Sequence, residues 1–113
     1  MISSPIMSFR SVAAIGLGLA LCAALPLQAQ DGNAEAGKLK RQMCEGCHGI
    51  AGYRTAYPVV FNVPKLGGQT AGYIVKALQD FRSGARKHPS MDAVAASLSA
   101  QDMADLAAYY SSK

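Results

Sequence analysis

The chain has 113 residues, 11 basic and 7 acidic side chains and a formal net charge of +4, and half of its residues are hydrophobic. Such a length suits one small domain. The chain contains no arginine-rich run and no basic run interleaved with aromatic residues, which argues against a nucleic-acid-binding protein.

The first 29 residues have the features of a secretory signal peptide. Arg10 supplies a positive charge ahead of an apolar run from Val12 to Leu25, and the small residue Ala29 follows shortly after. The run is shorter than the ~18 residues expected of a membrane-spanning helix, although an uncleaved anchor is the alternative. We expect a signal peptide over 1–29, a periplasmic location, no transmembrane segment after cleavage, and one domain over 30–113.

The segment 34–43 is predicted to form a helix that ends at the next motif. It follows the polar residues 31–33, contains no proline and has apolar residues at helical spacing. Gly37 lowers the helix propensity by up to ~1 kcal/mol, which suggests that another helix crosses closely at this point. A tolerated glycine without such a role is the alternative.

The next motif is Cys44-Glu45-Gly46-Cys47-His48, the C-x-x-C-H pattern of c-type haem attachment. Two thiols three positions apart can each add to one vinyl group of the same haem, and the imidazole that follows is placed to bind the iron. Gly46 helps the backbone to turn between the thiols. We therefore expect one haem c, attached covalently through Cys44 and Cys47, with His48 as an iron ligand.

Two other chemistries stay open for these residues. A redox dithiol is typical of a βαβ unit, and no alternation of strands and helices is predicted around the motif. A tetrahedral zinc site needs a fourth ligand, for which His88 is available. The three motif residues are, however, spaced more closely than zinc ligands usually are.

Glycines and prolines interrupt the segment 49–70, which predicts a long loop. Residues 58–63 could instead form a short strand, but the flanking prolines and the lack of a pairing partner disfavour it. A long loop inside a small domain is usually functional. We expect this loop to wrap one side of the haem.

Three helical segments are predicted after the loop. Thr70 is an N-cap candidate for a helix with one apolar stripe, and Gly84 ends it. A short helical piece follows over 92–98. Ser99 then begins the last helix, because Asp102 lies at the third helical position as in a capping box.

Met91 is the expected second iron ligand because it is predicted to lie in a polar loop, roughly forty residues after His48, and is therefore free to reach the opposite face of the haem. Met43 adjoins the motif and cannot reach around the ring, and Met103 belongs to the apolar stripe of the last helix. His88 is the rival ligand, being the other histidine and only three positions from Met91. An open sixth site is the third possibility.

Together these segments resemble the small bacterial class I cytochromes c, which carry one haem with His and Met ligands. The resemblance rests on the helix before the C-x-x-C-H motif, the loop 64–69, the helix 73–84, the lone methionine and the helix with Leu-Ala-Ala-Tyr-Tyr at 106–110. It implies an all-α fold of the small cytochrome c type, with three main helices plus a short helix wrapped around one covalently bound haem.

The resemblance also implies roles for single residues. The carbonyl of Pro64 would accept the ring N–H of His48, a contact that orients the ligand. Gly37 would lie where the N- and C-terminal helices cross, facing Leu106 or Tyr109. Met91 would be the distal thioether ligand.

A haem iron with His48 and Met91 bound has no position left for a substrate, so we expect a single-electron carrier and not an enzyme. A basic rim would attract redox protein partners such as a dehydrogenase or an oxidase with an acidic docking face. The cations available for this rim are Lys65, Arg82, Arg86 and Lys87.

The protein is expected to be a monomer or a subunit of a redox complex. One alternative is therefore a dedicated haem electron-transfer subunit of a periplasmic dehydrogenase. The other is a haem enzyme or gas-binding protein with an open sixth site.

Overall fold

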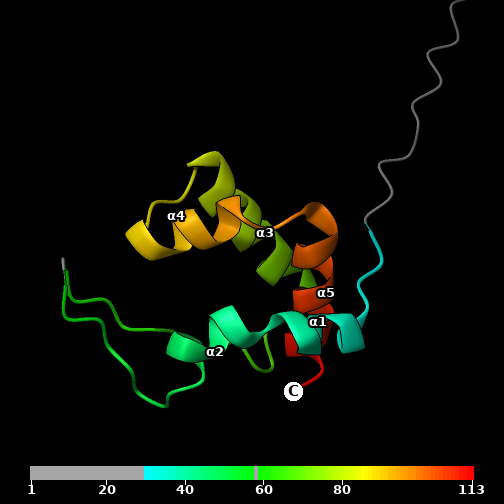
Figure 1. Ribbon diagram of the computed structural model, residues 1–113, viewed down its shortest axis with the longest axis horizontal. Helices are drawn as coiled ribbons and strands as arrows, with labels where there is room; N and C mark the ends of the chain where they lie inside the picture. Colours follow the sequence, from blue (N-terminus) through cyan, green and yellow to red (C-terminus); the bar gives the residue numbers. More distant parts are fainter. Residues whose placement is uncertain (1–29, 58) are drawn as a thin grey trace, which may run out of the picture.

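The computed structural model describes residues 30–57 and 59–113, so the predicted signal peptide lies outside the described residues (Figure 1). The described part contains five helices and no named strand, apart from one isolated antiparallel bridge between Arg54 and Asn62. The expected all-α fold is therefore confirmed. The helices are α1 (Ala34–Lys40), α2 (Gln42–His48), α3 (Ala71–Ser83), α4 (Pro89–Ala96) and α5 (Ala100–Ser111).

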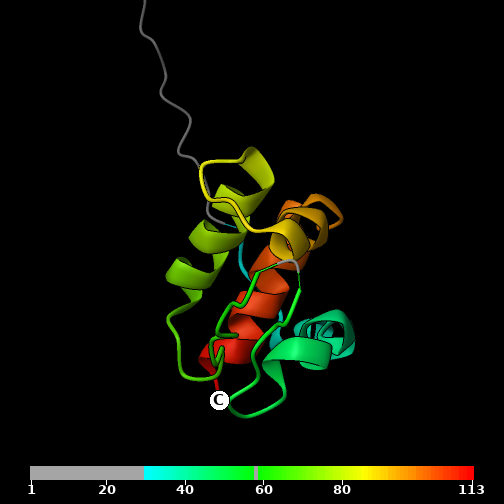
Figure 2. The ribbon, with the colours of Figure 1, turned by 90° about the vertical axis from the view of Figure 1, so that its left-hand side faces the viewer.

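Helix α5 is the centre of the arrangement. It lies between α3 on one side and α1 with α2 on the other (Figure 2). The largest fully buried side chains, Met103 and Leu106, both belong to α5. Buried residues of α3 and of the segment from α4 to α5 complete the core, among them Ile74, Leu78, Phe81, Ala95 and Leu98.

Helix α1 crosses α5 so closely that their backbones touch. A Cβ atom added to Gly37 would lie 2.1 Å from the carbonyl oxygen of Asp105 and 2.9 Å from Cβ of Tyr109, so only glycine fits. The predicted crossing is confirmed, and Tyr109 is one of its two contacts. The other contact is Asp105 and not Leu106, because Leu106 points into the core and is 2 % exposed.

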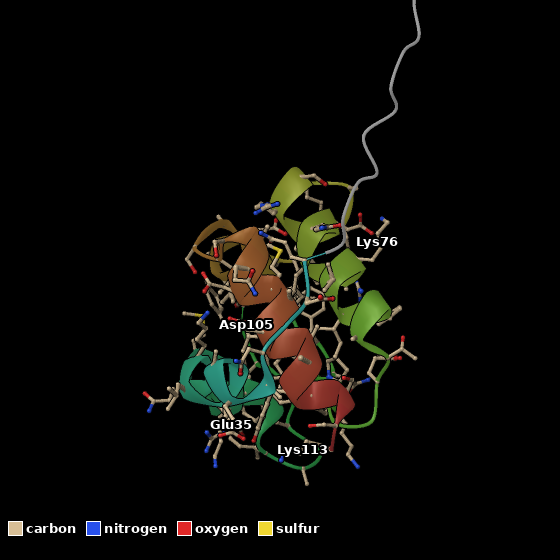
Figure 3. The ribbon with its side chains drawn as sticks, turned by 90° about the vertical axis from the view of Figure 1, so that its right-hand side faces the viewer. Glu35, Lys76, Asp105 and Lys113 are labelled. Carbon is tan, nitrogen blue, oxygen red and sulfur yellow. The ribbon has the colours of Figure 1, made fainter. Side chains whose placement is uncertain are left out.

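A polar cluster beside this crossing ties α1 to α5 (Figure 3). The buried carboxylate of Asp105 accepts hydrogen bonds from the backbone N–H of Asn33 at 2.8 Å, Lys40 Nζ at 2.6 Å and Gln101 Nε2 at 2.8 Å. Lys40 also pairs with Asp102 at 2.7 Å. The N–H of Asn33, followed by Lys40, lowers the pKa of Asp105, and Lys40 with Ser99 lowers the pKa of Asp102 to about 2.

The predicted boundary of the N-terminal helix was wrong. The expected helix over 34–43 is two helices, broken at Arg41, and the second one contains the whole C-x-x-C-H motif. Nothing in the sequence from Gln42 to His48 breaks a helix strongly, and the backbone carbonyl of Arg41 accepts from the N–H groups of both Cys44 and Glu45. The described residues therefore form five helical segments, where three main helices and one short helix were expected.

The short helix also differs from its predicted place. It spans Pro89–Ala96 instead of 92–98, so Met91 lies in the first turn of α4 and not in a loop. Proline is favoured in the first turn of a helix because its missing N–H is not needed there. Pro89 therefore begins this helix, and His88 is its N-cap.

The predicted caps at both ends of α3 and at the start of α5 are confirmed. The side chain of Thr70 accepts a hydrogen bond from the N–H of Tyr73, and Gly84 ends α3 with a φ of 80°. Ser99 and Asp102 form the reciprocal bonds of a capping box at the start of α5. Among the described residues, no helix has the length and apolar character needed to cross a membrane.

The first prediction concerns the crossing of α1 and α5. Gly37→Ala should lower the free energy of unfolding by about 3 kcal/mol, because the new methyl group collides with a backbone oxygen that cannot move alone. Gly72→Ala in α3 is the matched control, since an added Cβ meets nothing within 4 Å, and it should raise stability by up to ~1 kcal/mol. Urea unfolding of the haem-loaded proteins measures both, and equal effects would contradict the close crossing.

The second prediction concerns acid stability. Both Asp105 and Asp102 have pKa values below the ordinary 3.8, so the ionised carboxylates favour the folded state and this stability is lost as the pH falls from about 3.8 toward 2. Asp105→Asn should lower the free energy of unfolding by about 2 kcal/mol at pH 7. It should also make the decrease of this free energy with falling pH less steep. Glu35→Gln, on the exposed face of α1, should leave the slope unchanged. Equal slopes in Asp105→Asn and the unmutated protein would refute this role of Asp105.

Candidate cofactor site

A cavity of about 360 Å³ lies between α2, the loop over residues 49–70, α3, α4 and α5. Its volume is within the usual range of sites for small ligands and cofactors. Every residue proposed for the site from the sequence lines this one cavity, namely Cys44, Cys47, His48, Pro64 and Met91. Much of the remaining wall is apolar and includes Leu66, Ile74, Leu78, Phe81, Val94 and Leu106.

The two thiols belong to α2, where a spacing of three residues places side chains on neighbouring positions of one helix face. Both cysteines are free; Cys47 is exposed and Cys44 is partly buried against the core. Burial raises the pKa of the Cys44 thiol. The helical conformation of the motif therefore brings both sulfur atoms to the wall of the same cavity.

The imidazole of His48 is oriented by the loop. Its Nδ1 lies 2.7 Å from the carbonyl oxygen of Pro64. A carbonyl oxygen can only accept, so the Nδ1–H of His48 donates and the neutral ring keeps a lone pair on Nε2. This arrangement leaves Nε2 available to bind a metal.

Met91 reaches the cavity from α4, which lies apart from α2 in both views (Figures 1 and 2). Met43 also lines the cavity, but it shares α2 with His48. Met103 is 0 % exposed in the core, as its position in the apolar stripe predicted. The cavity therefore has an imidazole on one helix and a thioether on a separate helix.

Tyr110 lines the cavity from α5. The sequence did not indicate that its hydroxyl makes a polar contact there. Its hydroxyl donates to Glu45 Oε1 at 3.1 Å and thereby joins the last helix to the middle of the C-x-x-C-H motif. Burial is the main reason that the pKa of Tyr110 lies well above its usual range. In the sequence, Tyr110 falls on the same apolar stripe of the last helix as Met103, which predicts only core packing. Its hydrogen-bond partner is 65 residues away, so no local pattern indicated the contact.

The long loop is divided between cavity and surface. Phe61 and Leu66 line the cavity, whereas Tyr57, Val59 and Val60 do not and are 89 %, 57 % and 54 % exposed. The hydroxyl of Thr55 holds the loop together, because it donates to the carbonyl of Val59 at 2.9 Å and accepts from the N–H of Phe61 at 2.8 Å. The described residues of this segment form no named strand, so the loop that was predicted in preference to a strand over 58–63 is confirmed.

The donor set fits a covalently bound haem better than the other two chemistries. Two thiols, a free imidazole Nε2 and a thioether face an apolar cavity, as such a group requires. Over residues 30–57 and 59–113, no three His, Cys, Asp or Glu side chains are grouped so that they could hold a metal ion, which disfavours zinc. The helical surroundings of the cysteines also lack the βαβ unit of a redox dithiol.

Comparison with known proteins shows which family this chain is similar to. The family described as cytochrome c matches residues 34–112. Cytochrome c-554(548) of Halomonas halodenitrificans is 41% identical over 85 residues, which cover 73% of this chain and 98% of that protein. The thiosulfate dehydrogenase electron acceptor of Stutzerimonas stutzeri is 45% identical over 65 residues, or 58% of this chain and 29% of that protein.

Among solved structures, reduced recombinant cytochrome c4 from Pseudomonas stutzeri is similar to the chain with a TM-score of 0.59 and 41% sequence identity. The match covers 73% of this chain and 46% of the cytochrome c4 chain. The chain spans about two fifths of the length of the curated cytochrome c4 proteins that it matches, 39% and 41% in two of them.

Proposed function

This chain belongs to the cytochrome c family, and from that premise we propose that it is a periplasmic carrier of single electrons with one haem c. Cys44 and Cys47 would attach the haem, and His48 and Met91 would bind its iron. The observation that supports this most directly is that all four side chains line one cavity. When bound, the haem supplies reversible one-electron chemistry at its iron.

His48 is the proposed proximal ligand. The carbonyl of Pro64 holds its Nδ1–H at 2.7 Å, which selects the tautomer with a free Nε2 and limits rotation of the ring. Such a contact also makes the imidazole a stronger donor to the metal. Pro64 therefore orients the ligand without binding the iron itself.

Met91 is the proposed distal ligand. As an iron ligand, its thioether would favour the reduced state of the haem and raise the reduction potential, and the apolar wall of the cavity would act in the same direction. With both positions bound, no substrate can reach the iron. This closed site is the reason that we propose a carrier and not an enzyme or a gas-binding protein.

Export and domain extent also belong to the proposal. Residues 1–29 have the sequence of a secretory signal peptide, and covalent haem attachment through two cysteines suits an exported protein. The family match over 34–112 supports a single domain within 30–113. We therefore place the mature protein in the periplasm.

Redox proteins with an acidic docking face are the proposed partners. Lys65 and Arg86 are exposed and line the cavity, so they lie beside the group that must exchange electrons. Arg82 is less free, because its Nη1 donates to the carbonyl of Leu98 at 3.3 Å. Residues 46–79 include basic side chains but no Asp or Glu, which favours a partner of negative charge.

A dedicated subunit of a redox complex is the second candidate. The exposed side chains of Tyr57, Val59 and Val60 are not explained by the cavity, and an exposed apolar surface is typical of protein contacts. One relative is named an electron acceptor of a thiosulfate dehydrogenase. Gel filtration of the native periplasmic protein separates the candidates, since elution at the size of one small domain would contradict a permanent complex.

The third prediction tests Met91 as a ligand. Met91→Leu keeps most of the side-chain volume but removes the sulfur, so the far-red sulfur-to-iron absorption band of the oxidised protein should vanish and the reduced protein should bind carbon monoxide. Met43→Leu is the matched control and should keep the band. Absorption spectra of the purified holoproteins measure both effects. A band that survives Met91→Leu, or carbon monoxide binding by the unmutated protein, would overturn the proposed closed site.

The fourth prediction tests the docking face. Lys65→Glu should reduce the rate of association with a small acidic redox protein about tenfold at low ionic strength, and the difference should shrink at ~1 M salt. Lys38→Glu on the exposed face of α1 makes the same change in net charge away from the cavity, so it should have a much smaller effect. Stopped-flow kinetics compares the two. Equal effects would mean that net charge, and not this face, governs association.

A further inference from the structure

His88 has an unusual position at the start of α4. It is the N-cap residue, and its Nδ1 accepts a hydrogen bond from the backbone N–H of Met91 at 3.3 Å. Its own backbone N–H donates to Asp92 Oδ1 at 3.1 Å. The pair of bonds resembles a capping box, except that the side chain that accepts from the N-cap N–H belongs to the fourth helical residue, Asp92, and not to the third, Met91. Ser, Thr, Asp or Asn usually provides the N-cap acceptor.

The ring of His88 also joins three segments of the cavity wall. Its centroid lies 4.3 Å from that of Phe61 in the long loop and 6.4 Å from that of Phe81 near the end of α3. All three rings and Met91 line the cavity. One side chain therefore contacts the loop and α3 while it holds the first turn of α4.

The hydrogen bond to Met91 limits what His88 can do. Since Nδ1 accepts the N–H of Met91, the neutral ring must carry its proton on Nε2. Binding of iron by Nδ1 would break the N-cap, and the contact with Phe61 restricts rotation of the ring. These contacts suit a residue that supports a ligand, not one that serves as the ligand.

We propose that His88 is a positioning residue that fixes Met91 against the haem iron. This inference rests on the proposed function, because it takes Met91 as the distal ligand. Helix α4 has 8 residues and is too short to be stable alone, so its first turn depends on the cap and on the packing of the ring. Without His88, the backbone N–H of Met91 loses its partner and the thioether leaves the iron more often.

Three variants of the haem-loaded protein distinguish the contribution of the N-cap hydrogen bond from that of the aromatic ring of His88. His88→Asn keeps an N-cap acceptor and removes the ring, His88→Phe keeps a ring and removes the acceptor, and His88→Ala removes both. The rate of carbon monoxide binding by the reduced protein should rise about fivefold in the first two and on the order of thirtyfold in His88→Ala. The sulfur-to-iron band should weaken, and the backbone amide hydrogen of Met91 should exchange faster with solvent. Both effects should be larger in His88→Ala than in the other two variants.

Ser99→Ala is the matched control, because it removes the N-cap of α5, whose side chain accepts from the N–H of Asp102 at 3.0 Å. It should lower thermal stability as much as His88→Ala, yet leave the sulfur-to-iron band and carbon monoxide binding unchanged. If the His88 variants match Ser99→Ala in thermal stability, in the sulfur-to-iron band and in carbon monoxide binding, His88 has only a structural role and the inference is wrong.

The remaining outcomes distinguish this inference from the proposed function. A band that is lost in Met91→Leu but unchanged in His88→Ala would contradict the role of His88 alone. An unmutated protein that lacks the band and binds carbon monoxide only after His88→Ala would make His88 the ligand, which would overturn both.

Discussion

The backbones of α1 and of the residues just before it rest on the backbone of α5, and this contact exists only because two glycines, Gly32 before α1 and Gly37 within it, lack a Cβ atom. A Cβ on Gly32 would lie 2.0 Å from the carbonyl oxygen of Ala104, and one on Gly37 would lie 2.1 Å from that of Asp105. Helix α2 begins one residue after the break at Arg41, so the position of α1 determines where the C-x-x-C-H motif lies. The same α5 supplies Leu106 and Tyr110 to the cavity wall. The helix crossing therefore places the cysteines and His48 relative to the rest of the site.

The two proposed iron ligands are supported in similar ways from different parts of the chain. A carbonyl of the long loop orients His48, and the N-cap residue of α4 receives the backbone N–H of Met91. In both cases a hydrogen bond to a neighbouring segment limits the movement of the ligand residue, at the ring of His48 and at the backbone of Met91. Electron transfer is fast when the ligands hold nearly the same geometry in both oxidation states, so such supports fit a carrier better than a site that must open for substrate.

The surface around the cavity has two characters. Lys65 and Arg86 supply positive charge at the cavity, and Tyr57, Val59 and Val60 form an exposed apolar part of the loop. Charge mainly sets how fast partners meet, whereas apolar area contributes to how long they stay together. The charge therefore supports the proposed free carrier, and the apolar part of the loop supports the second candidate, a subunit of a redox complex.

The sequence by itself determined the chemistry of the motif and the helix ends, because both depend on residues only a few positions apart. The spacing of Cys44, Cys47 and His48 predicted a haem site, and the caps at Thr70 and Ser99 were predicted correctly. Local patterns failed where weak signals competed, as when Pro89 began a helix that was expected later.

Only the tertiary structure decided how distant residues meet. It showed that Gly37 faces Tyr109, one of the two residues expected there, together with Asp105, and that Tyr110 reaches Glu45. It also divided the apolar residues of the loop between cavity and surface. These contacts join segments whose separation along the chain is large, and the helix packing that brings them together is not encoded in any short stretch.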